Sequence, residues 1–205
     1  MSEEKLTEEK GKKLADIKKE AEEKACLVQR VLYFVEEFIA DPMCGKCYPC
    51  SLGTQEAKIR LIRISQYLEN VSDSDIQALK RIGSQMLEGS FCKKGKDTGR
   101  FIIETIISSE EDFNQHISGI CPKKECVNLI EYVIDPVLCI MCGKCLEACK
   151  YDAIIGEKRE PYLSEYLPFE IRQQRCTRCG ECVKVCPAEA IEIITTKKEE
   201  LVSKE

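Results

Sequence analysis

The sequence lacks the features that would make it a membrane or secreted protein. No run of apolar residues approaches the roughly 18 that a membrane-spanning helix needs. The best candidate, CLVQRVLYFVEEFIA, is interrupted by Gln29, Arg30, Glu36 and Glu37. The N-terminal MSEEKLTEEKGKK is rich in Glu and has no apolar segment of the kind found in secretory signals or transit peptides. We therefore expect a cytoplasmic protein without a membrane span.

Basic patches and catalytic groups are scarce as well. The 205 residues carry a formal net charge of -5, and the pI near 5.3 with no basic stripe argues against nucleic-acid binding. The chain has a single histidine, His116, and no recognisable arrangement for nucleophilic attack or proton transfer. We accordingly assign no catalytic residues to this chain.

Cysteine, in contrast, is abundant, with 15 residues. A secreted chain of this kind would be a disulfide scaffold, whereas clustered cysteines in a reducing compartment are more often metal ligands. The spacing favours metal, because CIMCGKCLEACKYDAI at 139 recurs as CTRCGECVKVCPAEAI at 176. Each copy is a C-x2-C-x2-C-x3-C run, which binds a [4Fe–4S] cluster.

In two-cluster ferredoxins the fourth cysteine of each run binds the other cluster. The first set, cluster A, is then Cys139, Cys142, Cys145 and Cys186. The second set, cluster B, is Cys176, Cys179, Cys182 and Cys149. We expect Gly143 and Gly180 to remove side-chain bulk, so that backbone N–H groups approach the sulfurs. This half resembles bacterial dicluster ferredoxins, except that Lys150 replaces the usual proline and EKREPYLSEYL implies an inserted loop.

A third cysteine group lies in the first half, in CGKCYPCSLGT and the later FCKKG. The C-x2-C-x2-C triplet alone would also fit a partial zinc site. Together the two segments resemble the C-terminal iron–sulfur domain of the NADH-binding 51 kDa subunit of respiratory complex I and of the beta subunit of bifurcating [FeFe]-hydrogenases. The resemblance implies one more [4Fe–4S] cluster, named the bundle cluster, on Cys44, Cys47, Cys50 and Cys92. Ser51 stands where that family usually has Arg.

The resemblance to the hydrogenase beta subunit extends over about residues 25 to 195. That subunit also continues through a CP…C segment into a dicluster ferredoxin domain. The Gly-rich GRGGAGFP-like segment that binds flavin and dinucleotide in the family does not occur in this sequence. We therefore expect the NADH- and FMN-binding part to reside on partner subunits.

Three cysteines and the histidine remain after these assignments: Cys26, His116, Cys121 and Cys126. They could be buried thiols and a surface histidine. A Cys3His set is, however, a common structural zinc site, and we predict one Zn2+ that ties the start of the helical domain to its exit into the ferredoxin domain. A fourth, His-ligated [4Fe–4S] cluster uses the same residue types, but HISGICPKKEC has no compact cluster-binding triplet.

The predicted fold class is α+β, with a small helical-bundle iron–sulfur domain followed by a ferredoxin-like 2[4Fe–4S] domain. Apolar stripes predict helices from Cys26 to about residue 117, with Ser51 and Thr54 as candidate N-caps for the stripe that includes Ile59 and Leu68. The segment SDSDIQALKRIGSQML begins with helix-capping residues. Strands are predicted at YVIDPVL, AIIGE, PFEIRQQ and IEIITT. The predicted boundaries are 1–25 (charged, solvated helix), 26–118 (helical domain), 119–134 (hinge with metal ligands), 135–196 (dicluster domain) and 197–205 (charged tail).

These features predict a non-catalytic electron-relay subunit. Three [4Fe–4S] clusters without a substrate site indicate single-electron transfer between a flavin- or metal-containing partner and another redox partner or ferredoxin. A free ferredoxin-type carrier is the main alternative. A zinc-dependent regulatory protein is disfavoured, because the fourth cysteine of each run does not fit a zinc finger.

Overall fold

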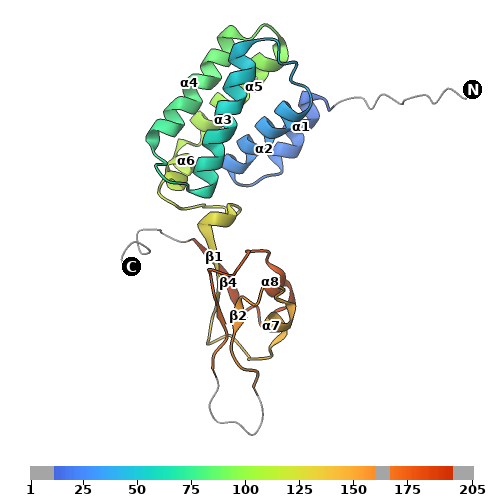
Figure 1. Ribbon diagram of the computed structural model, residues 1–205, viewed down its shortest axis with the longest axis vertical. Coiled ribbons are helices and arrows are strands. Elements are labelled where there is room, and N and C mark those ends of the chain that lie inside the picture. The colour runs from blue at the N-terminus through green and yellow to red at the C-terminus, as the bar shows by residue number, and fades with distance from the viewer. Residues whose placement is uncertain (1–11, 160–166, 196–205) are drawn as a thin grey trace, which may run out of the picture. The chain divides into compact units, whose positions relative to one another are not determined.

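The computed structural model describes residues 12–159 and 167–195 (Figure 1). The chain divides into two compact units, residues 1–118 and 119–205. The first unit is helical and the second combines short strands with short helices, so the α+β prediction is confirmed. No helix in the described part of the chain has the length and apolar character needed to cross a bilayer.

Residues 12–118 of the first unit form a bundle of six helices. Their bounds are α1 Leu14–Glu22, α2 Leu27–Ala40, α3 Tyr48–Gln66, α4 Asp73–Gly89, α5 Lys93–Ser108 and α6 Glu110–Ile117. Consecutive helices from α1 to α5 pack against one another, and α2 also contacts α5, where the rings of Phe34 and Phe101 stack with centroids 4.1 Å apart. The core therefore lies between α2, α3, α4 and α5 (Figure 1).

The N-terminal helix is not the solvated helix that its charge predicted. Fifteen of the first 24 residues are charged, yet Ile17 and Ala21 of α1 are fully buried, and α1 packs against α2. Lys12 Nζ also forms an ion pair with Glu37 of α2, at 2.7 Å. The prediction failed because two buried apolar residues are enough to dock a short helix whose remaining faces stay charged. Residues 1–11 and the predicted tail lie outside the described residues.

Helix α3 begins earlier than predicted. Cys47 is its N-cap residue, so Ser51 and Thr54 lie inside the helix, where Thr54 Oγ1 donates to the carbonyl of Cys50 at 2.8 Å. The predicted stripe was also wrong in part, because Ile59 and Leu68 are exposed. The buried residues of α3 are Cys50, Thr54, Ala57, Leu61, Ile64 and Ser65. Their spacing of three and four residues continues the face on which Cys50 lies.

Helices α4 and α5 approach closely through glycines. A Cβ on Gly99 would lie 2.6 Å from the carbonyl oxygen of Gly83, and a Cβ on Gly83 would lie 2.6 Å from Ile103 Cγ1. Neither position can carry a side chain without displacing its neighbour. The start of α4 is fixed by the predicted cap, since Ser72 and Asp75 form a capping box. At the other end of α4, Gly89 lies against Pro49, which brings the loop before α5 beside the start of α3.

The second unit has two-fold internal repetition. After the 3-10 turn η1 Val127–Leu129, the elements are β1 Ile130–Ile134, α7 Lys144–Ala148, β2 Ile154–Ile155, β3 Glu170–Ile171, α8 Glu181–Val185 and β4 Ile191–Thr195. Strand β1 pairs antiparallel with β4, and β2 with β3. All four predicted apolar runs contain strands, as expected. The predicted inserted loop falls largely on residues 160–166, outside the described residues.

Candidate metal centres

The four predicted ligands of the bundle cluster come from the starts of two helices. Cys47 is the N-cap residue of α3 and Cys50 lies in its first turn, whereas Cys92 is the N-cap residue of α5. Cys47 and Cys50 are buried, Cys92 is partly buried and Cys44 is exposed. The site therefore has a buried wall and an open edge.

The other three predicted ligands are electrostatic neighbours of the Cys50 thiol. Burial, followed by the neighbouring Cys47, Cys92 and Cys44, raises the pKa of Cys50 to about 12. A cation or a cluster would reverse this effect, because metal ligation requires the deprotonated thiolate. The donor set of four thiols thus fits a [4Fe–4S] group.

Each half of the repeat contributes to two cavities in the second unit. One cavity is lined by the predicted cluster A set, Cys139, Cys142, Cys145 and Cys186. The other is lined by the predicted cluster B set, Cys149, Cys176, Cys179 and Cys182. Each cavity therefore has three cysteines from one repeat and the fourth from the other. Burial, more than nearby thiols, raises the pKa of Cys182 to about 11 and also raises that of Cys145.

The fourth cysteine of each run accepts a hydrogen bond from a backbone N–H group. The Ala153 N–H donates to Cys149 Sγ at 3.4 Å, and the Ala190 N–H donates to Cys186 Sγ at 3.3 Å. Such donors stabilise the thiolate form of the cysteine and shift the reduction potential of a bound cluster. These two alanines occupy equivalent positions in the repeated KYDAI and PAEAI segments, so the repeat itself is the sequence signal for them.

The two repeat glycines adopt the left-handed backbone conformation. Gly143 and Gly180 have φ of +77° and +76°, and each is the N-cap residue of the short helix that follows. A Cβ on Gly143 would make only ordinary contacts, at 3.6 Å or more, with the Lys158 side chain. The left-handed conformation, which glycine adopts without strain, is a reason for glycine at both positions.

Sequence reasoning missed Tyr132 as a neighbour of cluster B. Its hydroxyl oxygen lies 3.2 Å from the position that a Cβ on Gly180 would take. Burial and the adjacent cysteines of the second run raise the pKa of Tyr132. Its place in the alternating strand β1 predicts only that the ring faces the core, because the cross-repeat contact depends on tertiary packing.

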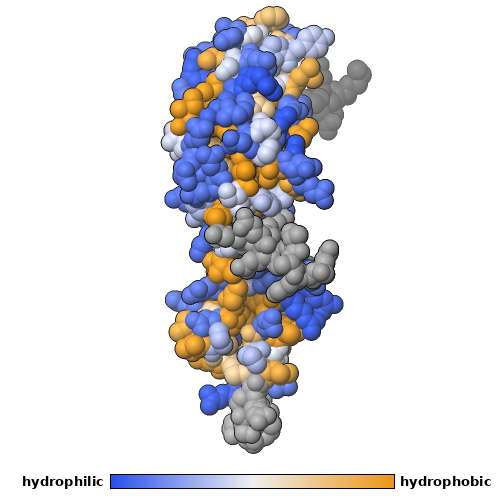
Figure 2. Space-filling model, turned by 90° about the vertical axis from the view of Figure 1, so that its left-hand side faces the viewer, coloured by the Kyte–Doolittle hydropathy of each residue, from blue (hydrophilic) through white to orange (hydrophobic). Residues whose placement is uncertain are grey.

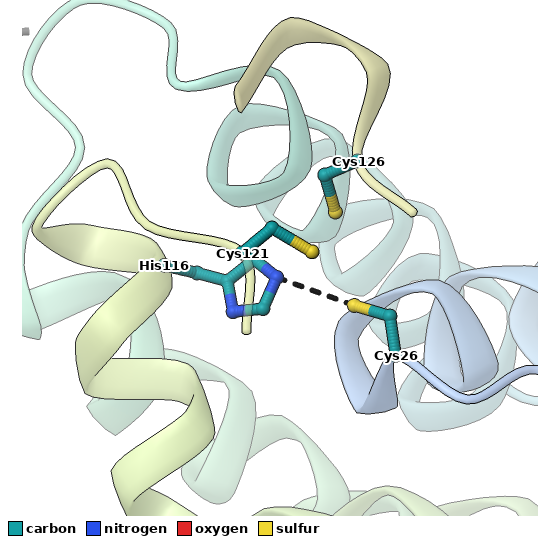
Figure 3. A group of neighbouring side chains, drawn as sticks. All are labelled: Cys26, His116, Cys121 and Cys126. Carbon is teal, nitrogen blue, oxygen red and sulfur yellow. Dashed lines mark hydrogen bonds between the residues drawn. The ribbon is translucent and has the colours of Figure 1, made fainter. Parts of the chain in front are cut away.

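A fourth group unites the remaining ligand residues. The donor atoms of Cys26, His116, Cys121 and Cys126 all lie within 4.8 Å of one another. All four residues are at most 1% exposed. Figure 3 shows the histidine ring and the three sulfurs converging, with His116 Nε2 3.2 Å from Cys26 Sγ. Four convergent soft and borderline donors can enclose one metal ion with no open position.

The histidine is oriented by its own helix. His116 Nδ1 lies 2.6 Å from the carbonyl oxygen of Asp112, one turn earlier in α6. Because a carbonyl only accepts, Nδ1 carries the proton and Nε2 keeps its lone pair for a metal. Cys26 and Cys126 are the N-cap residues of α2 and η1, and Cys121 lies in the loop after α6. The structure thus brings together a set that spacing alone left scattered.

Comparison with known proteins agrees with both cysteine patterns. Residues 30–116 match the family described as the NADH-ubiquinone oxidoreductase-F iron-sulfur binding region, and residues 132–195 match the 4Fe-4S dicluster domain. These matches support [4Fe–4S] clusters as cofactors of both units.

Two curated relatives cover parts of the chain. The HndC subunit of the NADP-reducing hydrogenase of Solidesulfovibrio fructosivorans is 29% identical over 142 residues, which are 69% of this chain and 28% of that protein. The F subunit of the NADH-quinone oxidoreductase of Streptomyces coelicolor is 31% identical over 98 residues, 48% of this chain and 21% of that protein. The chain thus spans less than a third of the length of either relative. The chain thus contains a region that matches the NADH-ubiquinone oxidoreductase-F iron-sulfur binding region, followed by a region that matches the 4Fe-4S dicluster domain.

Proposed function

We propose that this chain is an electron-transfer subunit of a multi-subunit oxidoreductase, relaying single electrons through three [4Fe–4S] clusters. The observation that carries the proposal is the pair of cavities, each lined by four cysteines drawn from both repeats. The four-cysteine set of the helical unit supplies the third site. Clusters bound by four thiolates exchange electrons and leave no coordination position for a substrate.

Exposed apolar side chains next to the ligand loops support contact with partner proteins. Tyr48 and Phe91, which flank Cys47 and Cys92, are 80% and 86% exposed. In the second unit Val137, near Cys139, is 89% exposed, and Figure 2 shows apolar surface across this unit in the lower part of the view. Apolar residues exposed beside redox centres favour docking of another subunit over a solvated surface.

The names of the relatives suggest which partners these are. One is a subunit of an NADP-reducing hydrogenase and the other a subunit of an NADH-quinone oxidoreductase. We infer that a flavin-containing subunit exchanges electrons with this chain, and that another subunit or a ferredoxin takes the opposite end of the relay. A free ferredoxin-type carrier would share the clusters but form no stable complex.

The fourth group is proposed to hold one structural Zn2+. A single zinc ion keeps sulfur at about 2.3 Å and nitrogen at about 2.0–2.1 Å, so its four donors must lie close together. The 4.8 Å limit on this group satisfies that requirement. A [4Fe–4S] cluster would place several iron and sulfide atoms among the four donors and hold them further apart. Complete burial of the ligands also suits a closed, structural site.

Purification from the native host tests the proposed function. We expect the tagged full chain, isolated anaerobically, to co-elute with a flavoprotein, and NADH or NADPH to bleach the cluster absorbance of that complex. The chain expressed alone should carry the clusters, bind no flavin and remain oxidised with either nucleotide. Elution of the native chain as a monomer without a flavoprotein would favour the free carrier. Nucleotide-dependent bleaching of the isolated chain would contradict the predicted need for a partner.

Ligand exchange between the repeats gives a second prediction. Replacing Cys149 by serine should alter the electron paramagnetic resonance (EPR) signal of cluster B, because this residue lies in the cavity with Cys176, Cys179 and Cys182. The matched control, Cys186→Ser, should alter cluster A. Signals are assigned with Cys142→Ala and Cys179→Ala, each of which removes a ligand from one compact run. The reverse pattern, with Cys149→Ser acting on cluster A, would disprove the cross-ligation.

Metal analysis separates the zinc site from the clusters. Fully loaded protein should contain about 12 iron atoms per chain and about one zinc atom. Cys26→Ala should remove the zinc and leave the iron unchanged, because Cys26 belongs only to the Cys3His group. The control Cys44→Ala should lower iron by about four atoms and spare zinc. Loss of iron from Cys26→Ala, or full zinc retention, would refute the zinc assignment.

A further inference from the structure

The buried hydroxyl group of Ser90 has no hydrogen-bond partner among the described protein atoms. It is the C-cap residue of α4, and its backbone N–H donates to the Met86 carbonyl at 3.1 Å. The residue is only 3% exposed. Within residues 12–159 and 167–195, Ser90 Oγ and Gln173 Oε1 are the buried side-chain oxygens that have no hydrogen-bond partner. Buried polar groups are nearly always satisfied, so an acceptor for Ser90 is needed.

The surroundings of Gly95 show which acceptor is near. A Cβ on Gly95, in the first turn of α5, would lie 2.7 Å from Ser90 Oγ and 3.3 Å from Cys50 Sγ. The serine hydroxyl and the ligand sulfur thus border the same small volume, which the glycine leaves free of a side chain. Cys50 is itself buried, so this contact lies on the enclosed wall of the bundle-cluster site.

We propose that the Ser90 hydroxyl donates a hydrogen bond to a sulfur of the cluster held by Cys44, Cys47, Cys50 and Cys92, and so raises its midpoint potential. The acceptor is a sulfide of the cluster, because Ser90 Oγ has no hydrogen-bond partner among the described protein atoms, Cys50 Sγ included. The inference rests on the proposed bundle cluster, but not on the identity of any partner. Ser90 acts as a positioning and tuning residue, since it supplies no ligand.

The direction of the effect follows from charge. One-electron reduction adds negative charge, which spreads over the sulfurs, and a donor directed at a sulfur stabilises that form more than the oxidised form. Burial strengthens the interaction, because water does not screen it. The result is a higher potential than the same cysteines would give without the hydroxyl. In the second unit, backbone N–H groups donate to Cys149 of cluster B and Cys186 of cluster A.

A near-isosteric pair of variants tests the proposal on the full chain. Ser90→Thr keeps the hydroxyl and Ser90→Val replaces it with a methyl group, so their steric effects on Gly95 and Cys50 are matched. In EPR-monitored redox titrations the bundle cluster is identified as the signal that Cys92→Ala abolishes. At a fixed ambient potential, its reduced-to-oxidised ratio should be about threefold to tenfold lower in Ser90→Val than in Ser90→Thr, the range expected for one net hydrogen bond.

Two controls make the result specific. Ser65→Ala removes a serine that is equally buried, at 4% exposed, but whose hydroxyl already donates to the Ile62 carbonyl at 3.1 Å. It should leave the bundle-cluster potential unchanged. In the wild-type protein, electron–nuclear double resonance of the reduced cluster in H2O and D2O should show an exchangeable coupled proton, which Ser90→Val loses and Ser90→Thr retains.

Equal potentials in the Thr and Val variants would overturn the proposal. So would the absence of an exchangeable coupled proton in the wild type, whether or not the variants load iron. Failure of the proposed function looks different, since it would appear as iron near eight atoms per chain with no signal that depends on Cys92.

Discussion

The gathering of cysteine thiols into groups, each with at least one buried thiol, is the constraint on which the structure depends. Buried thiols that face one another resist ionisation, as the raised pKa of Cys50 shows, whereas metal ligation requires thiolates. Only a group that brings compensating positive charge makes such sites stable in the ionised form. Loading of the sites and folding of the chain are therefore expected to be coupled, with helices and strands acting mainly to hold sulfur atoms at fixed places.

The N-termini of helices help to stabilise the thiolates that metal binding requires. Cys26, Cys47 and Cys92 are the N-cap residues of α2, α3 and α5. The unsatisfied N–H groups and the positive end of the helix dipole favour negative charge at these positions. In the repeated unit, Cys149 and Cys186 instead follow the short helices α7 and α8, and each accepts a backbone N–H. Two different local solutions thus stabilise thiolates in the two units.

Much of this organisation can be predicted from the sequence because it is local. The C-x2-C spacing and the capping box at Ser72 are short-range patterns, as are the apolar stripes and runs that predict the helices and strands of the α+β fold. Predictions failed where tertiary packing decides. Cys47 rather than Ser51 or Thr54 caps α3, and α1 docks through Ile17 although its composition suggested a solvated helix.

For the candidate sites as well, the sequence identifies the ligand residues, and the fold shows how they lie in space. Elimination named Cys26 and His116 as ligands, but only the fold could show that residues 90 positions apart in sequence are 3.2 Å apart. The roles of Asp112 and Ser90 were invisible, because a backbone carbonyl and a lone serine carry no motif. Their contributions arise from the packing of helices around ligands that the sequence had already suggested.

Anomalous X-ray diffraction from anaerobically grown crystals of the loaded full chain tests the central claim most directly. Data collected on either side of the iron and zinc absorption edges assign each metal to its ligands. We predict iron at the three four-cysteine sites, with cluster A and cluster B each bound by both repeats, and zinc alone between Cys26, His116, Cys121 and Cys126. Iron at that fourth site, or no iron beside Cys44, Cys47, Cys50 and Cys92, would contradict it.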